Sequence, residues 1–102
     1  MRIEWRAEAA EDRREAIAFL RQRNPTAALR IASAVRHWVA MLSKQPHLGR
    51  AGRVPDTREL LIPQSPYIVI YTVDAARDTV VILRMLHGAR RWPVVEDDEP
   101  AP

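Results

Sequence analysis

The sequence predicts an α+β fold in which an N-terminal strand and an antiparallel helical hairpin pack with a three- to four-stranded antiparallel sheet. Between residues 8 and 43, apolar positions recur with a helical period, interrupted once at Asn24-Pro25. From residue 57 to residue 87, the chain changes to short runs rich in β-branched residues, separated by turn-forming segments. Helices followed by strands are typical of α+β domains.

Length and composition predict one small domain. The chain has 102 residues, 47% of them hydrophobic, and no cysteine, which excludes disulfides, a thiolate nucleophile and a cysteine-based zinc site. No apolar run suits a membrane span or a secretory signal, so we expect a cytoplasmic protein. The net charge of +3 hides an acidic segment, residues 96–102, after a basic body of net charge +7. We expect residues 1–95 to form the domain and residues 96–102 to be a disordered tail.

The first elements follow from local patterns. Residues 2–6 alternate polar and apolar side chains, which predicts a half-buried strand. A helix is expected over residues 8–23, with acidic side chains in its first turns and arginines in its last, as the helix dipole favours. Asn24 as N-cap and Pro25 at the first helical position then predict a second helix to about residue 43. The short joint predicts an antiparallel hairpin.

Strands are predicted in the second half of the chain. Residues 44–56 contain two glycines and two prolines without a sustained period and are expected to form a loop. Strands follow at residues 57–62, 67–73 and 79–87, with short links that favour antiparallel neighbours. The last two are apolar on both faces, although one helical hairpin covers only one face. Either the sheet curls over its second face, or a partner covers it, or Trp92 and the C-terminal segment fold back across it.

Six short motifs stand in order along the chain. They are Asn24-Pro25 with Ala27-Ala28, Pro46 with Gly49-Arg50, Thr57-Arg58-Glu59-Leu60, Pro66-Tyr67-Ile68-Val69-Ile70-Tyr71, Val81-Ile82-Leu83, and Leu86-His87-Gly88-Ala89-Arg90. Together with the order of elements, they resemble the RelE/ParE superfamily of toxins from bacterial type II toxin–antitoxin modules, over residues 2–93. The resemblance implies a growth-arresting toxin that is neutralised by a cognate antitoxin protein.

The superfamily has two activities, and the residues favour the ParE-like one. The resemblance implies that RelE-like members cut messenger RNA on the ribosome, whereas ParE-like members inhibit DNA gyrase and have no hydrolytic chemistry of their own. A RelE-like pattern has an arginine in the middle strand, where this sequence has Ile68, and often a tyrosine or histidine after the position of Arg90, where it has neither. We therefore predict a gyrase inhibitor rather than an enzyme, with an endoribonuclease as the alternative.

Basic and aromatic side chains are the predicted binding residues. Arginine forms bidentate contacts with carboxylates and phosphates, and tryptophan is an amphipathic anchor at interfaces. We predict that the target or the antitoxin is bound by Arg58, Arg84, Arg90, Arg91 and Trp92. A direct contact with nucleic acid is left open.

The ribonuclease alternative needs a base and phosphate-binding cations. Its candidates are Glu59 or His87 as the base, with Arg58, Arg84 and Arg90 around the phosphate. Because Arg58 and Glu59 are adjacent in a strand, we predict that they point to opposite faces. For Arg84, we expect a groove or an acidic partner such as Glu59. His37 and His47 have no neighbours with metal-ligand spacing, so we expect no metal site and no cofactor.

Overall fold

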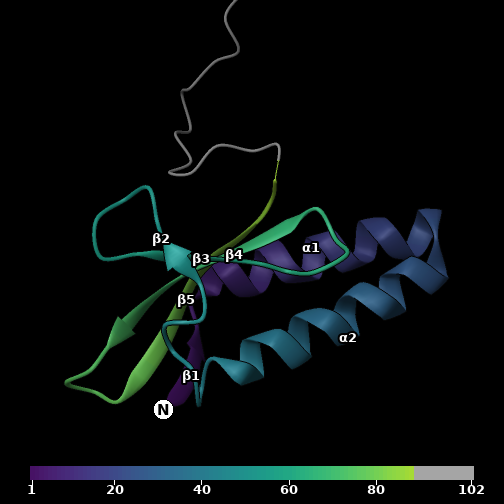
Figure 1. Cartoon of the computed structure of the whole chain (residues 1–102). Coiled ribbons are helices and arrows are strands. Elements are labelled where there is room, and N and C mark those ends of the chain that lie inside the picture. Colours follow the sequence, from purple (N-terminus) through teal and green to yellow (C-terminus); the bar gives the residue numbers. More distant parts are fainter. Residues whose placement is uncertain (89–102) are drawn as a thin grey trace, which may run out of the picture.

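Residues 1–88, which the computed structural model describes, form two helices and a five-stranded sheet. The elements are β1 (Arg2–Trp5), α1 (Ala7–Arg23), α2 (Pro25–Met41), β2 (Arg50–Ala51), β3 (Arg58–Leu61), β4 (Tyr67–Asp74) and β5 (Thr79–His87). Figure 1 shows the helical hairpin extending along one side of the sheet. The α+β class, the helical hairpin and the four expected strands are confirmed.

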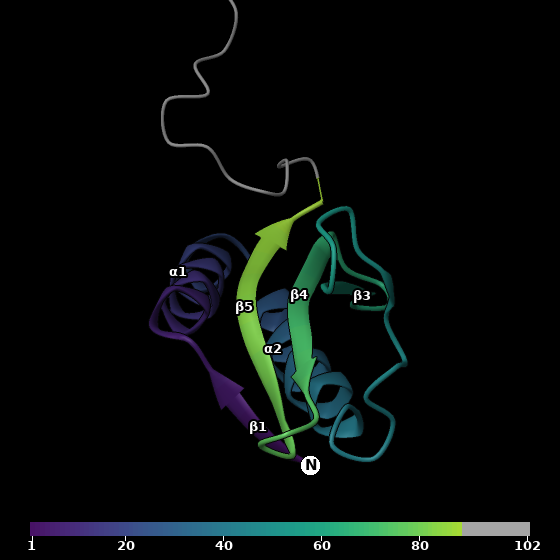
Figure 2. The ribbon, with the colours of Figure 1, turned by 90° about the vertical axis from the view of Figure 1, so that its left-hand side faces the viewer.

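The helical hairpin is capped as the sequence predicts. The side chain of Asn24 accepts a hydrogen bond from the backbone N–H of Ala27 at 3.1 Å, and Pro25 begins α2. The buried residues of α2 are Ala28, Ile31, Val35 and Val39. In α1, only Ala9 is fully buried. Accordingly, α2 lies across the sheet behind β4 and β5, while α1 lies beside β5 (Figure 2).

The sheet differs from the expectation in strand number and in direction. Its order is β1-β5-β4-β3-β2, and β1 runs parallel to β5, so the sheet is mixed rather than wholly antiparallel. The additional strand, β2, has two residues, which is too short to show an alternating pattern. The pairing of β1 with β5 joins the two ends of the domain, and no local period encodes the direction of such a pairing.

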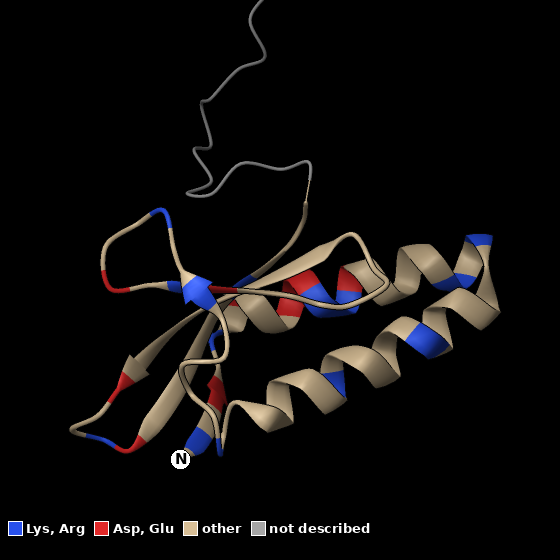
Figure 3. Cartoon of the chain, viewed as in Figure 1, with Lys and Arg blue, Asp and Glu red and all other residues tan. Residues whose placement is uncertain are grey.

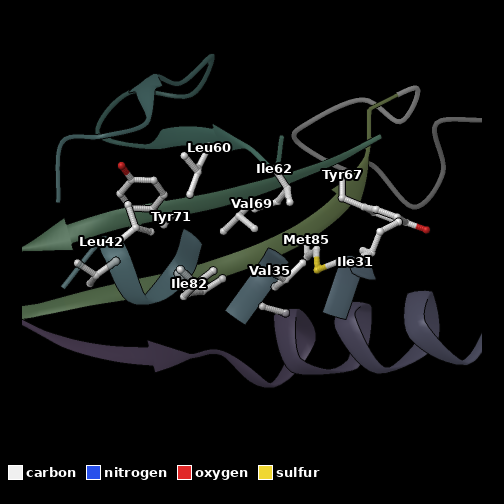
Figure 4. Close-up of a cluster of buried hydrophobic side chains, with 13 residues drawn as sticks. Ile31, Val35, Leu42, Leu60, Ile62, Tyr67, Val69, Tyr71, Ile82 and Met85 are labelled. Atoms are coloured by element: carbon white, nitrogen blue, oxygen red, sulfur yellow. The ribbon is translucent and has the colours of Figure 1, made fainter. Parts of the chain in front are cut away.

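The core lies between α2 and the sheet, as Figure 4 shows. Alternate side chains of β4 point into it, because successive side chains of a strand face opposite ways. Tyr67, Val69 and Tyr71 are exposed by 7%, 0% and 0%. They pack in one cluster with Leu60, Ile62, Val80, Ile82 and Met85 of the sheet side and with Ile31, Val35, Val39 and Leu42 of the helix side. The spacing of apolar residues in α2 thus becomes one continuous contact surface.

The second face of the sheet is closed at its centre by the chain itself. Ile70, Val81 and Leu86 alternate with core residues and so point away from α2, yet they are exposed by only 2%, 4% and 3%. The burial of these three side chains therefore requires no partner protein. Leu61, near the edge of the same face, is 58% exposed. The expected contribution of Trp92 lies outside the described residues.

A carboxylate fastens α1 to the edge of β5. The pairing of β1 with β5 ends at Ile82, so the later part of this edge has no strand beside it. Asp12 of α1 accepts the backbone N–H of Met85 at 2.9 Å. Its Oδ2 also accepts a hydrogen bond from Nε of Arg84 at 2.7 Å, and its Oδ1 accepts one from Nη2 of Arg84 at 2.9 Å. These bonds to a carboxylate raise the pKa of Arg84. We call this arrangement the Asp12 clamp.

The expectation of an acidic partner for Arg84 is confirmed, but that partner is Asp12 and not the suggested Glu59. A β-bulge interrupts the pairing between β4 and β5, with Leu83 as the extra residue between the partners of Ile70 and Tyr71. A bulge changes the direction of the side chains around it. The guanidinium of Arg84 reaches α1 rather than β3.

The Asp12 clamp gives a prediction about stability. Asp12→Ala should lower the free energy of unfolding by about 2 kcal/mol, because the partly buried guanidinium and an edge N–H both lose their acceptor. Urea denaturation measures the change. Glu15→Ala, an exposed carboxylate on the same helix, is the control. A loss below about 0.5 kcal/mol for Asp12→Ala would contradict the prediction, since surface ion pairs contribute that little.

Candidate functional site

The predicted site residues divide between the two faces of the sheet. Glu59 lies opposite Ile70 of β4 and shares its face, away from α2. Arg58 lies opposite Tyr71 and shares its face, toward α2. The prediction that Arg58 and Glu59 point in opposite directions is therefore confirmed. Three further predicted residues, Arg90, Arg91 and Trp92, lie outside the described residues.

Glu59 is the polar centre of a hollow on the face away from α2. Its Oε1 accepts a hydrogen bond from Nη2 of Arg50 at 3.1 Å, and its Oε2 accepts the backbone N–H of Arg53 at 3.1 Å. The carboxylate side chain is 10% exposed. The hollow holds about 110 Å³ and is lined by Arg50, Arg53, Glu59, Ile68, Ile70, Leu86 and Gly88. We call it the open-face hollow; three of its side chains are aliphatic, including Ile68.

His87 belongs to a different hollow, on the helix side of the sheet. It lies opposite Tyr67, and the two rings meet edge to face with centroids 5.7 Å apart. This hollow holds about 310 Å³ and is lined by Asp12, Glu15, Ala16, Phe19, Tyr67, Met85, Leu86 and His87. Its charged groups within the described residues are carboxylates rather than arginines. The two candidate bases, Glu59 and His87, therefore do not share a site.

Arg58 holds a loop. Its Nη1 donates to the backbone oxygen of Gly49 at 2.7 Å and, at 3.4 Å, to that of His47. Arg58 also lines a third hollow, of about 420 Å³, with His47, Ala51, Asp56, Thr57, Thr72 and Val73. The other two guanidinium nitrogens, Nε and Nη2, take no part in these two bonds. Arg58 therefore has a structural role, and its binding role stays a prediction.

Tyr71 positions the same loop from inside the core. Its hydroxyl accepts the backbone N–H of Gly49 at 2.8 Å and donates to the backbone oxygen of Pro46 at 2.8 Å. A Cβ on Gly49 would lie 2.8 Å from the Tyr71 hydroxyl oxygen and 2.9 Å from the backbone oxygen of Glu59. Only glycine permits this approach. The loop thus delivers Arg50, the next residue, to the open-face hollow.

Sequence reasoning missed three residues that organise the site. Arg50 and Arg53 lie in the segment expected to be a featureless loop, where the motif Gly49-Arg50 was the available signal. No sequence pattern indicates the role of Asp12, because its partner Arg84 is 72 residues away.

Residues 1–88 contain neither a metal-binding cluster nor a membrane-spanning helix. In that part of the chain, no group of three or more His, Cys, Asp or Glu side chains is arranged to hold a metal ion. None of its helices is both long enough and apolar enough to span a bilayer.

A hairpin of helices on a mixed sheet of this order is a fold known from bacterial toxins. A chain of the chromosomal ParDE toxin–antitoxin system of Pseudomonas aeruginosa superimposes with a TM-score of 0.74 at 23% identity, covering 85% of this chain and 95% of that one. A chain of the RelBE2 toxin–antitoxin complex of Mycobacterium tuberculosis gives a TM-score of 0.62 at 26% identity, covering 84% and 95%. The fold is therefore that of the RelE/ParE toxins.

The sequence decides between the branches of that class. Residues 3–92 match the family described as the ParE toxin of the type II toxin–antitoxin system parDE. The candidate toxin Y4kP of Sinorhizobium fredii is 36% identical over 94 residues, which span 92% of this chain and 95% of that protein. The chain belongs to the ParE toxin family of type II toxin–antitoxin systems.

The burial of Tyr67 and Tyr71 should make the folded protein less stable at high pH. Burial raises the pKa of Tyr67 and of Tyr71 in the folded protein. The tyrosines of the unfolded chain lose their protons from about pH 10. Above that pH, the unfolded state binds fewer protons than the folded state, so unfolding becomes more favourable; below it, the contribution is fully present. These are the two tyrosines of the sequence, which has one lysine, Lys44, and no cysteine.

Urea midpoints measured from about pH 8 to about pH 11 test this prediction. Tyr71→Phe should flatten the decline, and it should also cost about 2 kcal/mol at neutral pH, because Gly49 and Pro46 lose their partner. Lys44→Gln is the control and should keep the decline. An unchanged pH profile in Tyr71→Phe would contradict the assignment.

Proposed function

We propose that this ParE-family toxin binds DNA gyrase and stalls it on cleaved DNA, and that a cognate antitoxin protein neutralises it. In this proposal the protein is a cytoplasmic inhibitor and has no hydrolytic chemistry of its own. The alternative is the RelE-like activity, an endoribonuclease that cuts messenger RNA on the ribosome.

The separation of the acid–base candidates by the sheet carries the proposal. Cleavage of RNA by its own 2′-hydroxyl requires a base, an acid and cations around a single phosphorus atom. Glu59 lies in the open-face hollow, whereas His87 lines the hollow beside α1. One phosphodiester cannot contact both groups across the thickness of a sheet.

Two arginines beside these candidates, Arg50 and Arg84, already have carboxylate partners. Arg50 donates to Glu59, and Arg84 donates to Asp12 with two nitrogens. The middle-strand position that is an arginine in the RelE-like pattern is the aliphatic Ile68. A hollow with an aliphatic floor, whose Arg50 is already paired with Glu59, favours a protein side chain over a phosphate.

Recognition of gyrase is proposed to use the open-face hollow and the segment after it. Gly88 lines the hollow, and Arg90 follows two residues later in the sequence, within covalent reach of roughly 7 Å. The proposed contacts are Arg90, Arg91 and Trp92, with Arg58 as a second choice. Arg84 remains a proposed contact through its exposed part, since its side chain is 22% exposed beside Asp12.

Induction of the chain alone in a bacterial host tests the proposal. We expect cleaved-DNA complexes of gyrase and a DNA-damage response as the first effects. Co-expression of the protein encoded by the neighbouring small reading frame should restore growth. Rapid, codon-linked cleavage of translated messages before any DNA damage would overturn the gyrase proposal in favour of the endoribonuclease.

A substitution of Glu59 separates the two activities. Glu59→Gln should retain growth arrest, because its amide oxygen can still accept one of the two N–H groups that Glu59 binds, from Arg50 or from Arg53, while the base is lost. A ribonuclease that uses Glu59 as its base would lose activity about 100-fold or more. His87→Gln is the matched variant for the other candidate base. Loss of arrest in either variant, at normal abundance and stability, would contradict the prediction.

A further inference from the structure

The hollow that Arg58 lines is larger than the two that hold the candidate bases. It holds about 420 Å³, against about 110 Å³ for the open-face hollow and about 310 Å³ for the hollow beside His87. Pockets for small organic ligands have volumes of roughly 300–1,000 Å³. We call it the loop hollow, because the loop between β2 and β3 forms part of its wall. Its lining residues are His47, Ala51, Asp56, Thr57, Arg58, Thr72 and Val73.

Two neighbouring residues of the loop hollow offer N–H donors. Nη1 of Arg58 donates to the backbone oxygen of Gly49 at 2.7 Å and to that of His47 at 3.4 Å, and these bonds leave Nε and Nη2 for a ligand. His47 is exposed at the same hollow, and an imidazole donates an N–H in either protonation state. A guanidinium beside an imidazole suits a phosphate group.

A second group of lining residues offers acceptors. Oγ1 of Thr72 donates to the backbone oxygen of Asp56 at 2.8 Å, and Oγ1 of Thr57 donates to that of Val54 at 2.6 Å. Because each hydroxyl has used its proton, it can only accept a bond from a ligand. The carboxylate of Asp56 is a stronger acceptor than either. In Figure 3, the loop between β2 and β3 projects from the sheet and carries charges of both signs, and Asp56 is its acidic residue.

A ligand that satisfies both groups has an anion at one end and adjacent N–H donors at the other. A nucleoside monophosphate has this pattern, and its flat base suits the apolar side chains of Ala51 and Val73. Guanine offers two parallel donors, N1–H and N2–H, which match the two oxygens of a carboxylate. Adenine and cytosine place a ring acceptor beside their amino group, and that acceptor would face a carboxylate oxygen. The chemistry of the hollow therefore favours guanine.

We propose that the loop hollow binds a guanosine monophosphate unit, with its phosphate at Arg58 and His47 and its base edge at Asp56. A free nucleotide and an unpaired guanosine in a strand present the same groups. The proposal goes beyond gyrase inhibition and does not depend on it, since its test measures binding to the free protein.

Two simpler ligands fit the loop hollow less well. Inorganic phosphate would pair with Arg58, but the carboxylate of Asp56 would remain as an unmatched like charge in the same hollow. A small α-amino acid such as glycine would match both charges, but it would fill only part of about 420 Å³. Both ligands serve as probes in the test.

Titration of the ¹⁵N-labelled full chain tests the proposal through the amide signals of the lining residues. The probes are guanosine monophosphate, inosine monophosphate, guanosine, inorganic phosphate and glycine. Inosine monophosphate lacks the N2 amino group, and guanosine lacks the phosphate. We expect guanosine monophosphate to move the signals of Ala51, Thr57 and Thr72, and each other probe to bind at least about tenfold more weakly.

Asp56→Asn is the diagnostic variant, and Asp78→Asn is its matched control. Both residues have a positive φ, 67° and 52°, which asparagine tolerates, but Asp78 lies outside the hollow. Asp56→Asn should weaken binding of guanosine monophosphate about tenfold and abolish its preference over inosine monophosphate, whereas Asp78→Asn should change neither. A site for phosphate alone would bind more tightly in Asp56→Asn, because a negative charge is removed, and that result would overturn the proposal.

His47→Gln tests the phosphate end, and His37→Gln, which replaces an exposed histidine of α2, is its control. His47→Gln should weaken binding of guanosine monophosphate about threefold and keep its preference over inosine monophosphate. An equal effect of the two substitutions would contradict the placement of the phosphate.

Two oligonucleotides identify the source of the nucleotide. A short single strand with one guanosine among thymidines presents an unpaired base edge, whereas a duplex pairs that edge with cytosine. Binding of the single strand in competition with guanosine monophosphate indicates a strand, and binding of the monophosphate alone indicates a free nucleotide; both support the site. Failure of both to bind, equal binding of inosine monophosphate, or displacement of the monophosphate by the duplex as strongly as by the single strand would overturn it.

Discussion

The carboxylate of Asp12 compensates for a strand that ends early. The β1 strand covers the edge of β5 only to Ile82, and a backbone N–H beyond that point needs another acceptor. Asp12 accepts the N–H of Met85 and also binds the guanidinium of Arg84, so one side chain satisfies the sheet edge and a partly buried charge. Because these bonds fix α1 beside β5, α2 is left to lie across the sheet and bury its apolar stripe.

The same arrangement sets the chemistry that each face of the sheet offers. On the helix side, the hollow at the end of β5 has the carboxylates of α1 beside His87. On the other face, the loop held by Tyr71 brings Arg50 to Glu59 and places both beside aliphatic side chains. The sheet thus keeps the two candidate bases, Glu59 and His87, on opposite faces.

Much of the fold was predictable because its signals are local. The N-cap Asn24 acts on a backbone N–H three residues away, and the apolar spacing of α2 needs no knowledge of what it covers. The strands of the meander follow from alternation and short links. By contrast, β2 is too short to carry a pattern, and the parallel pairing of β1 depends on where the helical hairpin returns the chain. Three covers were open for the second face of β4 and β5, and Ile70 and Val81 are buried there within the chain itself.

The sequence by itself determined the family, the helical hairpin, the strands of the meander and the opposite directions of Arg58 and Glu59. These features depend on residue types and on spacings of a few positions. Only the tertiary structure decided that Arg84 binds Asp12, that Arg50 binds Glu59, and that Glu59 and His87 lie on different faces. Such contacts join distant segments and depend on a bulge, a strand end and a loop anchor. These contacts form only in the folded chain, where each buried backbone group and each buried charge needs a partner.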